Sequence, residues 1–142
     1  MAASVKNAHS AMFLAQRREL RRISVFLEGF CAESGLARER CLRLNLVLEE
    51  LFVNTVRHGH HGDCEAPVWI TLDAQPEAVQ VTYEDMAPAF NPYAHLPAKH
   101  PDTTVEMRKV GGLGVLLTRE LAATRDYAYL FGRNRIRLSL LR

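Results

Sequence analysis

The stretch from Arg40 to Gly59 constrains the fold of this chain most strongly, because it has the pattern of one uninterrupted helix. It holds no glycine or proline before Gly59 and is rich in leucine and valine, which predicts a helix. At about 100° per residue, one broad face collects Leu44, Val47, Leu48, Leu51 and Thr55, and a second apolar side collects Leu46 and Val53. We therefore expect other elements to cover this helix from two directions.

A polar stripe runs along one edge of the same helix. Glu50, Asn54 and His58 follow one another at intervals of four residues, which places them in one line. Such a stripe on a largely buried helix costs free energy unless it has a partner, and an asparagine at position 54 does not suit a surface ion pair. The amide oxygen of Asn54 can ligate a hard cation such as Mg²⁺, and the Glu50 carboxylate can accept a proton. The alternative is a structural role for both, such as capping a neighbouring turn.

Length and composition indicate one globular domain. The chain has 142 residues, of which 48% are hydrophobic and 24% charged, so we expect a single domain over residues 1–142 with a loose segment at residues 1–9. The net charge of +2 is too small to indicate direct binding to nucleic acid or to a membrane. No stretch approaches the roughly 20 apolar residues that cross a bilayer, and the N-terminus lacks the apolar core of a signal peptide.

The cysteines favour a reducing compartment. Cys31, Cys41 and Cys64 are odd in number and show no CxxC spacing, so we expect no disulfide framework and a cytoplasmic location. The segment from His58 to Cys64 contains three histidines and one cysteine, which raises the possibility of a metal site. Because no second ligand cluster follows at a spacing typical of zinc sites, the other interpretation is an exposed polar loop.

Periodicity along the rest of the chain predicts the other elements. We expect a short strand over residues 10–15, helices over 16–34 and 115–123, and strands over 68–72, 78–84, 127–131 and 136–141, with a turn at Gly132–Asn134. The first of these helices carries Arg17, Arg18, Arg21 and Arg22 on one face, which is either a solvated surface or a partner-binding or dimer surface. This order predicts an α/β (α+β) two-layer sandwich, with a mixed, mostly antiparallel sheet and helices packed on one face.

Four features of the chain fit one task together. The acid and amide of the central helix come first, Asp85 follows at a strand end, a long proline-rich segment comes next, and Gly111–Gly114 opens a helix. Glycines at a helix start let backbone N–H groups approach an anion, which suits a triphosphate. A carboxylate can accept a hydrogen bond from the amine of adenine, and a long loop can act as a lid that excludes water.

These motifs resemble those of the GHKL ATP-binding superfamily, which includes histidine kinases, type II topoisomerase ATPase subunits and mismatch-repair proteins. LVLEELFVNTVRHG is similar to the N box, DMAPAFNP to the DxGxxFxP adenine box, GGLGVLLTRELA to the glycine-box helix, and FGRNRIRLSL to the final hairpin. The resemblance covers about residues 16–140, and within the superfamily it is strongest to the bacterial anti-sigma-factor serine/threonine kinases. It implies a Bergerat-type ATP-binding fold that uses ATP and Mg²⁺.

The resemblance implies roles for single residues. Glu50 would be the catalytic base, Asn54 the Mg²⁺ ligand and Asp85 the acceptor for the adenine amine, while His58 has no clear role. The further nucleotide-binding positions would be Ala87 and Phe90 in the adenine box and Gly111, Gly112, Leu113 and Gly114 in the glycine box, with Leu113 packing behind glycines that face the phosphates. Arg108 and Lys109 precede the glycines and either contact the γ-phosphate or form a solvated surface pair.

One position departs from the family pattern. Ala87 stands where the family usually has glycine, and an alanine in a left-handed conformation costs about 1 kcal/mol. ATP affinity is then expected to be weakened, or the loop to be reshaped. The proline-rich segment also has no glycine between Pro92 and Val110, which indicates a less mobile lid.

The function implied by the resemblance is an ATP- and Mg²⁺-dependent protein serine/threonine kinase of the anti-sigma type. Such a protein would be a homodimer that holds a sigma factor inactive and phosphorylates a serine of an antagonist protein. The alternative is an ATP-binding module that sequesters a regulatory partner without phosphotransfer, which the alanine at position 87 favours.

Overall fold

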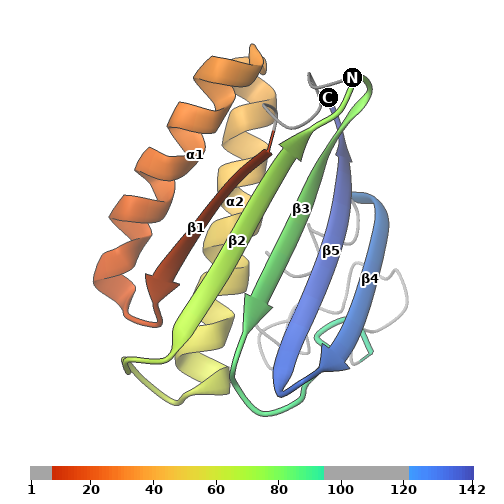
Figure 1. Ribbon diagram of the computed structural model, residues 1–142. Coiled ribbons are helices and arrows are strands. Elements are labelled where there is room, and N and C mark those ends of the chain that lie inside the picture. The colour runs from red at the N-terminus through yellow and green to blue at the C-terminus, as the bar shows by residue number, and fades with distance from the viewer. Residues whose placement is uncertain (1–7, 95–121) are drawn as a thin grey trace, which may run out of the picture.

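The fold is a two-layer sandwich in which two helices cover one face of a five-stranded sheet (Figure 1). The computed structural model describes residues 8–94 and 122–142. The helices are α1 (Leu20–Ser34) and α2 (Arg38–Asn54), with a 3₁₀ turn over Arg17–Glu19 and a π-helical turn over Thr55–Gly59; the strands are β1 (Ala8–Leu14), β2 (Pro67–Ala74), β3 (Ala78–Asp85), β4 (Ala122–Leu130) and β5 (Arg133–Leu141).

The sheet has the order β1-β2-β3-β5-β4, and each described pair of neighbours is antiparallel. The predicted sandwich with helices on one face is confirmed, and the described strands include none of the parallel pairs that a mixed sheet would contain. The pairing of β3 with β5 sets Asp85 opposite Asn134. Two polar residues therefore meet at the end of the sheet where β3 stops and β5 begins.

The core lies between the helices and the inner face of the sheet. Alternate residues of β2, β3 and β5 are buried, as expected when one face of a sheet is covered and the other is open. On the helices, the predicted apolar stripes are buried, with Ile23, Leu27, Phe30 and Cys31 on α1 and Leu44, Val47, Leu48, Leu51 and Phe52 on α2.

The ends of the helices follow their local chemistry. Gly35 takes a left-handed conformation with φ of 66° and ends α1, as the sequence predicts for a C-terminal cap. The predicted helix from Arg40 to Gly59 begins two residues earlier, at Arg38, and its last turn is wider than an α-helical turn. In that turn the His60 N–H donates to the Thr55 carbonyl at 2.9 Å. Single π-helical turns of this kind occur frequently at functional sites.

Several predicted boundaries were wrong. Residues 8 and 9 pair with β2 and are not part of a loose segment, while residues 1–7 lie outside the described part of the chain. The predicted third helix falls outside it as well, except that residues 122 and 123 belong to β4. The last hairpin turns at Phe131 and Gly132, with φ of 53° and 77°, so Asn134 is a strand residue and not a turn residue.

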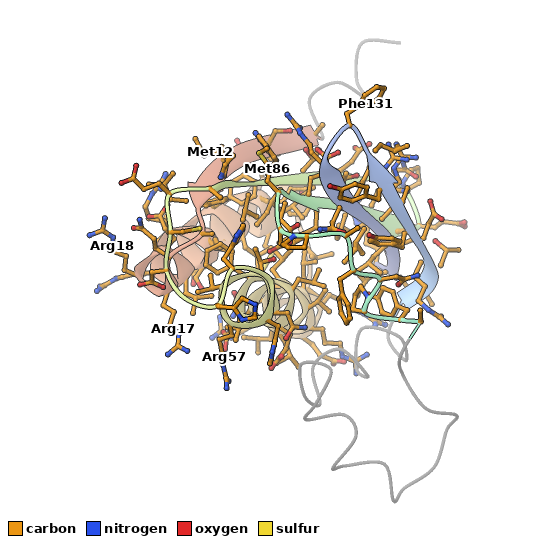
Figure 2. All side chains as sticks on the ribbon, turned by 90° about the horizontal axis from the view of Figure 1, so that it is seen from below. Met12, Arg17, Arg18, Arg57, Met86 and Phe131 are labelled. Atoms are coloured by element: carbon orange, nitrogen blue, oxygen red, sulfur yellow. A yellow bond between two sulfur atoms is a disulfide. The ribbon has the colours of Figure 1, made fainter. Side chains whose placement is uncertain are left out.

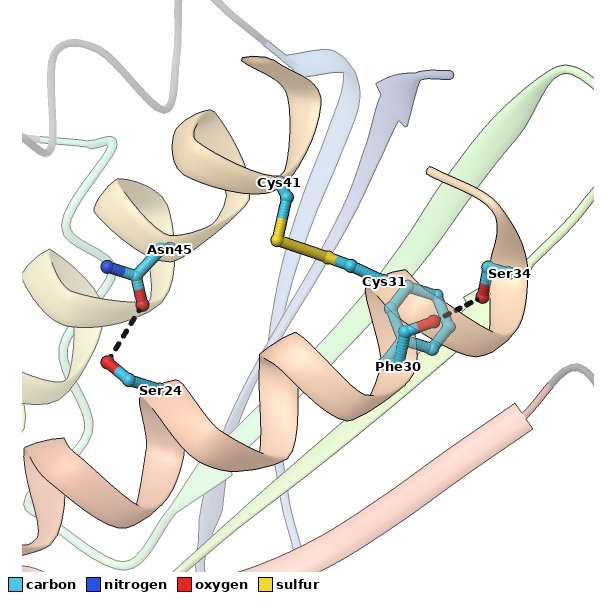
Figure 3. The surroundings of a disulfide bond; sticks show 6 residues. All are labelled: Ser24, Phe30, Cys31, Ser34, Cys41 and Asn45. Atoms are coloured by element: carbon cyan, nitrogen blue, oxygen red, sulfur yellow. Dashed lines mark hydrogen bonds between the residues drawn. A yellow bond between two sulfur atoms is a disulfide. The ribbon is translucent and has the colours of Figure 1, made fainter. Parts of the chain in front are cut away.

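The expectation that the chain has no disulfide was wrong. Cys31 and Cys41 are joined, with 6.1 Å between their Cα atoms, which is within the ordinary range for a disulfide. Figure 3 shows the bond connecting α1 to α2. Cysteine spacing in the sequence did not predict it, because the pair becomes adjacent only when the two helices fold back against each other. Cys64 is a free thiol.

None of the described helices combines the length and the apolar character that crossing a membrane requires.

Candidate functional site

A cavity of about 340 Å³ opens where the last turn of α2 meets the end of β3 and the start of β5. The residues that line it come from α2, the π-helical turn, both strands and the loop after β3: Leu51, Asn54, Thr55, His58, Gly59, His61, Tyr83, Asp85, Ala87, Pro88, Ala89, Phe90, Pro92, Asn134 and Ile136. Its size lies within the range of small-molecule sites. The sequence-predicted residues Asn54, Asp85, Ala87 and Phe90 thus share one cavity.

Asp85 is a buried carboxylate held by hydrogen-bond donors. Thr55 Oγ1 donates to Oδ2 at 2.7 Å, Asn134 Nδ2 donates to Oδ1 at 2.9 Å, and the Ala87 N–H donates to Oδ1 at 3.2 Å. These bonds fill three of its roughly four acceptor positions. Within the described residues the remaining position, on Oδ2, has no donor, and a ligand in the cavity can donate to it.

A hydroxyl relay supports the Asp85 carboxylate from the core. Tyr83 Oη lies 2.6 Å from Thr55 Oγ1, and each hydroxyl has only one proton to donate. Either hydroxyl can be the donor between them, and each also lies within hydrogen-bond distance of the Leu51 carbonyl, at 3.1 Å from Thr55 and 3.2 Å from Tyr83. Burial and then the charge of Asp85 raise the pKa of Tyr83 well above its ordinary value, so the phenol keeps its proton.

Asn134 fastens the loop after β3 and was missed by the sequence analysis. Its Nδ2 donates to Asp85 Oδ1 and to the Ala87 carbonyl, both at 2.9 Å, while its Oδ1 accepts from the Phe90 N–H at 3.0 Å and from the Tyr127 hydroxyl. One sequence signal was available: Asn134 has the same strand phase as the buried residues of β5. A polar residue at an inward position needs a partner.

Asn54 has the property expected of a ligand-binding amide. Its Oδ1 and Nδ2 are both buried, and neither finds a hydrogen-bond partner in the described residues. A buried amide without a partner costs free energy, and this one lines the cavity. An amide oxygen is a suitable ligand for Mg²⁺, so the residue fits the predicted metal ligand.

Glu50 lies one turn before Asn54, but it is not among the described residues that line the cavity. Its pKa is raised above the ordinary value, first because burial disfavours the carboxylate and then because of the neighbouring Glu49, while Arg57 opposes the shift. A raised pKa makes the carboxylate a better proton acceptor. The predicted base is therefore next in the chain to the lining residue Leu51 without itself belonging to the described lining.

Ala87 does not adopt the left-handed conformation that its replacement of glycine led us to expect. The only described non-glycine residues with positive φ are His61 and Phe131. A Cβ built on Gly59 would lie 2.7 Å from the Ala87 Cβ, which shows that the extra methyl group occupies space left by Gly59. The expected strain of about 1 kcal/mol is therefore absent, and the loop packs closely on the π-helical turn.

The segment from His58 to Cys64 contributes two histidines to the lining of the cavity. His58 and His61 line it, and His61 has a φ of 60°, which histidine tolerates better than most residues. No group of three or more histidine, cysteine, aspartate or glutamate side chains within residues 8–94 and 122–142 is placed to hold a metal ion. His58 and His61 form part of the wall of the cavity.

Other predicted residues lie away from the cavity or beyond the described chain. Arg108, Lys109, Gly111, Gly112, Leu113 and Gly114 are outside the described residues, so their roles remain predictions. Figure 2, which views the molecule from the end where the cavity opens, shows Arg17, Arg18 and Arg57 projecting outward. All three are exposed.

Taken together, the cavity offers an acceptor at Asp85, an amide at Asn54 that has no partner among residues 8–94 and 122–142, and several apolar lining residues. This combination suits a planar base with an exocyclic amine, attached to an anionic group that carries a metal. A search of curated proteins finds no match to the sequence. The model of the histidine kinase-like ATPase domain matches residues 13–140, which is nearly the whole chain. The chain therefore belongs to the histidine kinase-like ATPase domain family.

Proposed function

We propose that this protein is an ATP- and Mg²⁺-dependent protein serine/threonine kinase of the anti-sigma-factor type. The observation that carries the proposal is the cavity lined by both the Asp85 carboxylate and the Asn54 amide, which has no hydrogen-bond partner among the described residues. The family match supports an ATP-binding module. The choice of a protein serine as acceptor rests on the resemblance of the motifs to anti-sigma-factor kinases.

In this proposal, Asp85 selects adenine. Its Oδ1 already accepts from Asn134 and from the Ala87 N–H, and its Oδ2 accepts from Thr55 alone. The adenine amine would donate to Oδ2. Guanine has a carbonyl oxygen at the same ring position. This oxygen and the carboxylate are both acceptors and cannot form a hydrogen bond, so the site should reject guanine nucleotides.

Asn54 would hold Mg²⁺, and Glu50 would accept the proton of the acceptor hydroxyl. Bound Mg²⁺ supplies charge neutralisation for the β- and γ-phosphates during transfer. Glu50 is partly buried and has a raised pKa, which suits a proton acceptor. Arg108 and Lys109 remain candidates for contact with the γ-phosphate.

The proposed partners are a sigma factor and its antagonist protein, bound by a homodimer in the cytoplasm. The first helix and the turn before it present Arg17, Arg18, Arg21 and Arg22, and all four are exposed. Arg22 also bonds to Glu19 and lies over the ring of Phe13. The other three give a cationic surface that favours an acidic partner.

Two measurements test the proposal. Calorimetric titration with ATP and Mg²⁺ should show binding by the native protein and at least a hundredfold weaker binding by Asp85→Asn. Labelled ATP should then transfer its γ-phosphate to a serine of a candidate antagonist, and Glu50→Gln should abolish this transfer while ATP binding persists. Undiminished transfer by Glu50→Gln would show that Glu50 is not the base.

The second candidate function is an ATP-binding module that sequesters its partner without phosphotransfer. The observation that favours it is the absence of Glu50 from the described lining of the cavity. ATP would then increase thermal stability and partner affinity, and no phosphoprotein would form with any candidate antagonist. Glu50→Gln would leave both effects of ATP unchanged.

A further inference from the structure

The disulfide joins the two helices at the end of the molecule away from the cavity. Cys31 lies near the C-terminal end of α1 and Cys41 near the N-terminal end of α2. Figure 3 shows the bond beside the hydrogen bond from Ser24 to Asn45, at 3.2 Å, which connects the same two helices. The cross-link is therefore part of the α1–α2 interface, and the nucleotide proposal does not use it.

The two cysteine residues differ in exposure. Cys31 is buried, with 6% of its surface exposed, and belongs to the hydrophobic core. Cys41 is partly exposed and lines a surface pocket of about 120 Å³. The other residues that line this pocket are Ser24, Leu27, Glu28, Arg38, Leu42 and Asn45. A small thiol can thus approach the disulfide from the side of Cys41.

We propose that Cys41 is a site of thiol–disulfide exchange with low-molecular-weight thiols of the glutathione class. The thiolate attacks Cys41 Sγ, a new bond forms between the two sulfur atoms, and the bond to Cys31 breaks. Cys31 leaves as a thiolate and takes a proton from water. A second thiolate then attacks the sulfur of the adduct, which releases the oxidised small thiol and leaves Cys41 reduced, so the electrons balance.

The lining of the pocket favours this reaction on Cys41. Arg38 is a cation that attracts the carboxylates of a small peptide thiol, and the Glu28 carboxylate on the opposite helix can accept a hydrogen bond from its ammonium group. Acid quenching protonates the Cys31 thiolate and so traps the adduct on Cys41 before the internal bond reforms.

The exchange should loosen the α1–α2 contact without unfolding the protein. Core side chains of both helices remain packed together, and the Ser24–Asn45 hydrogen bond remains. Cys41 is 13 residues before Asn54, which corresponds to about 20 Å along a helix. Nucleotide binding at the other end of α2 should be unaffected, so a failure of either proposal leaves the other standing.

The first experiment uses the unmodified full chain. The protein is incubated with reduced glutathione, quenched with acid, alkylated and digested, and the peptides are mapped by mass spectrometry. We expect the glutathione adduct on Cys41 at least tenfold more often than on Cys31, and we expect only Cys64 to be alkylated before glutathione is added. An adduct mainly on Cys31, or three alkylated cysteines before any reduction, would overturn the proposal.

Matched variants give the second experiment. Cys64→Ser removes the remaining thiol, and Cys31→Ser or Cys41→Ser is added to it, so that each double variant keeps one cysteine of the pair. With oxidised glutathione, the variant that keeps Cys41 should form its adduct at least tenfold faster than the variant that keeps Cys31. In denaturant the two rates should become equal. This result would show that the difference comes from how accessible each cysteine is in the folded protein. Equal rates in the folded state contradict the inference.

Discussion

At the scale of single residues, the site consists of polar side chains at positions that face the core, where apolar residues are the rule. Asp85 and Asn134 occupy inward positions of β3 and β5, and Thr55 shares the buried face of its helix. Each is satisfied by the others and by nearby backbone. A connected buried network of this kind specifies one geometry, because a partly satisfied one is costly.

Replacing Asn134 by alanine should therefore destabilise the protein by about 2 kcal/mol, since the Phe90 N–H and Asp85 lose a buried partner. Chemical denaturation measures the change. Ser139→Ala, on the outward face of the same strand, is the control and should change stability by less than about 0.5 kcal/mol. Equal effects of the two substitutions would show that the hydrogen bonds of Asn134 contribute little to the free energy of unfolding.

Glu50→Gln should raise the thermal midpoint at neutral pH. The raised pKa of Glu50 in the folded state means that folding favours its protonated form. The associated stability is complete below the pKa of the unfolded chain and is lost as pH rises through the folded-state pKa. Glutamine removes this loss, so the difference from the native protein should be present at pH 8 and vanish below about pH 4.

Glu49→Gln is the matched control, because it removes the same charge from an exposed neighbour that takes no part in lining the cavity. It should lower the pKa of Glu50 by relieving repulsion, and it should not abolish phosphotransfer. A stability gain for Glu50→Gln that is independent of pH would contradict the role of burial.

At the scale of elements, the end of α2 and the loop after β3 are fitted to each other. The π-helical turn brings Gly59 against Ala87, and the same loop carries the backbone groups that Asn134 holds. Helix, loop and strand thus form one wall of the cavity. A change at the contact between Gly59 and Ala87 should therefore alter both ligand binding in the cavity and the stability of the protein.

Gly59→Ala should cost about 1–3 kcal/mol, because the new Cβ would lie 2.7 Å from the Ala87 Cβ. Adding Ala87→Gly should restore most of that stability, and a double-mutant cycle measures the coupling. Gly29→Ala is the control: beyond its chain neighbours and the backbone of its own helix, no atom of the described residues lies within 4 Å of its added Cβ, and it should stabilise α1 by up to about 1 kcal/mol. Additive effects at 59 and 87 would contradict the contact.

At the scale of the whole molecule, binding in the cavity connects both layers. The lining residues come from α2 on one layer and from β3 and β5 on the other. A ligand that contacts both layers in the folded state stabilises the fold by mass action. The cross-link between Cys31 and Cys41 acts at the opposite end of the helical layer.

Mg²⁺-ATP at a concentration 100 times its dissociation constant should add about 2.7 kcal/mol to the free energy of unfolding, seen as a rise of several degrees in the thermal midpoint. Mg²⁺-GTP at the same concentration should produce no rise. Guanine has a carbonyl oxygen at the ring position of the adenine amine, so it cannot donate the hydrogen bond that Asp85 would accept. Asp85→Asn should lose the response to ATP. Equal responses to both nucleotides would show that Asp85 does not discriminate between adenine and guanine.

The sequence by itself predicted the two described α-helices, the strands apart from their ends, the class of fold, and several of the residues that line the cavity. Helical and alternating patterns record which side of each element is buried, and such patterns are local. Asn54 was found in this way, from a polar stripe on a largely buried helix, whereas Asp85 was found as an acid at a strand end within a motif that resembles the adenine box.

Only the tertiary structure decided that Asn134 holds the loop, that Ala87 fits against Gly59, that Glu50 is absent from the described lining of the cavity, and that Cys31 meets Cys41. Each of these facts depends on a distance between elements that are separate in the chain. Local periodicity carries no information about that distance, because it is set by how the helices pack on the sheet and on each other.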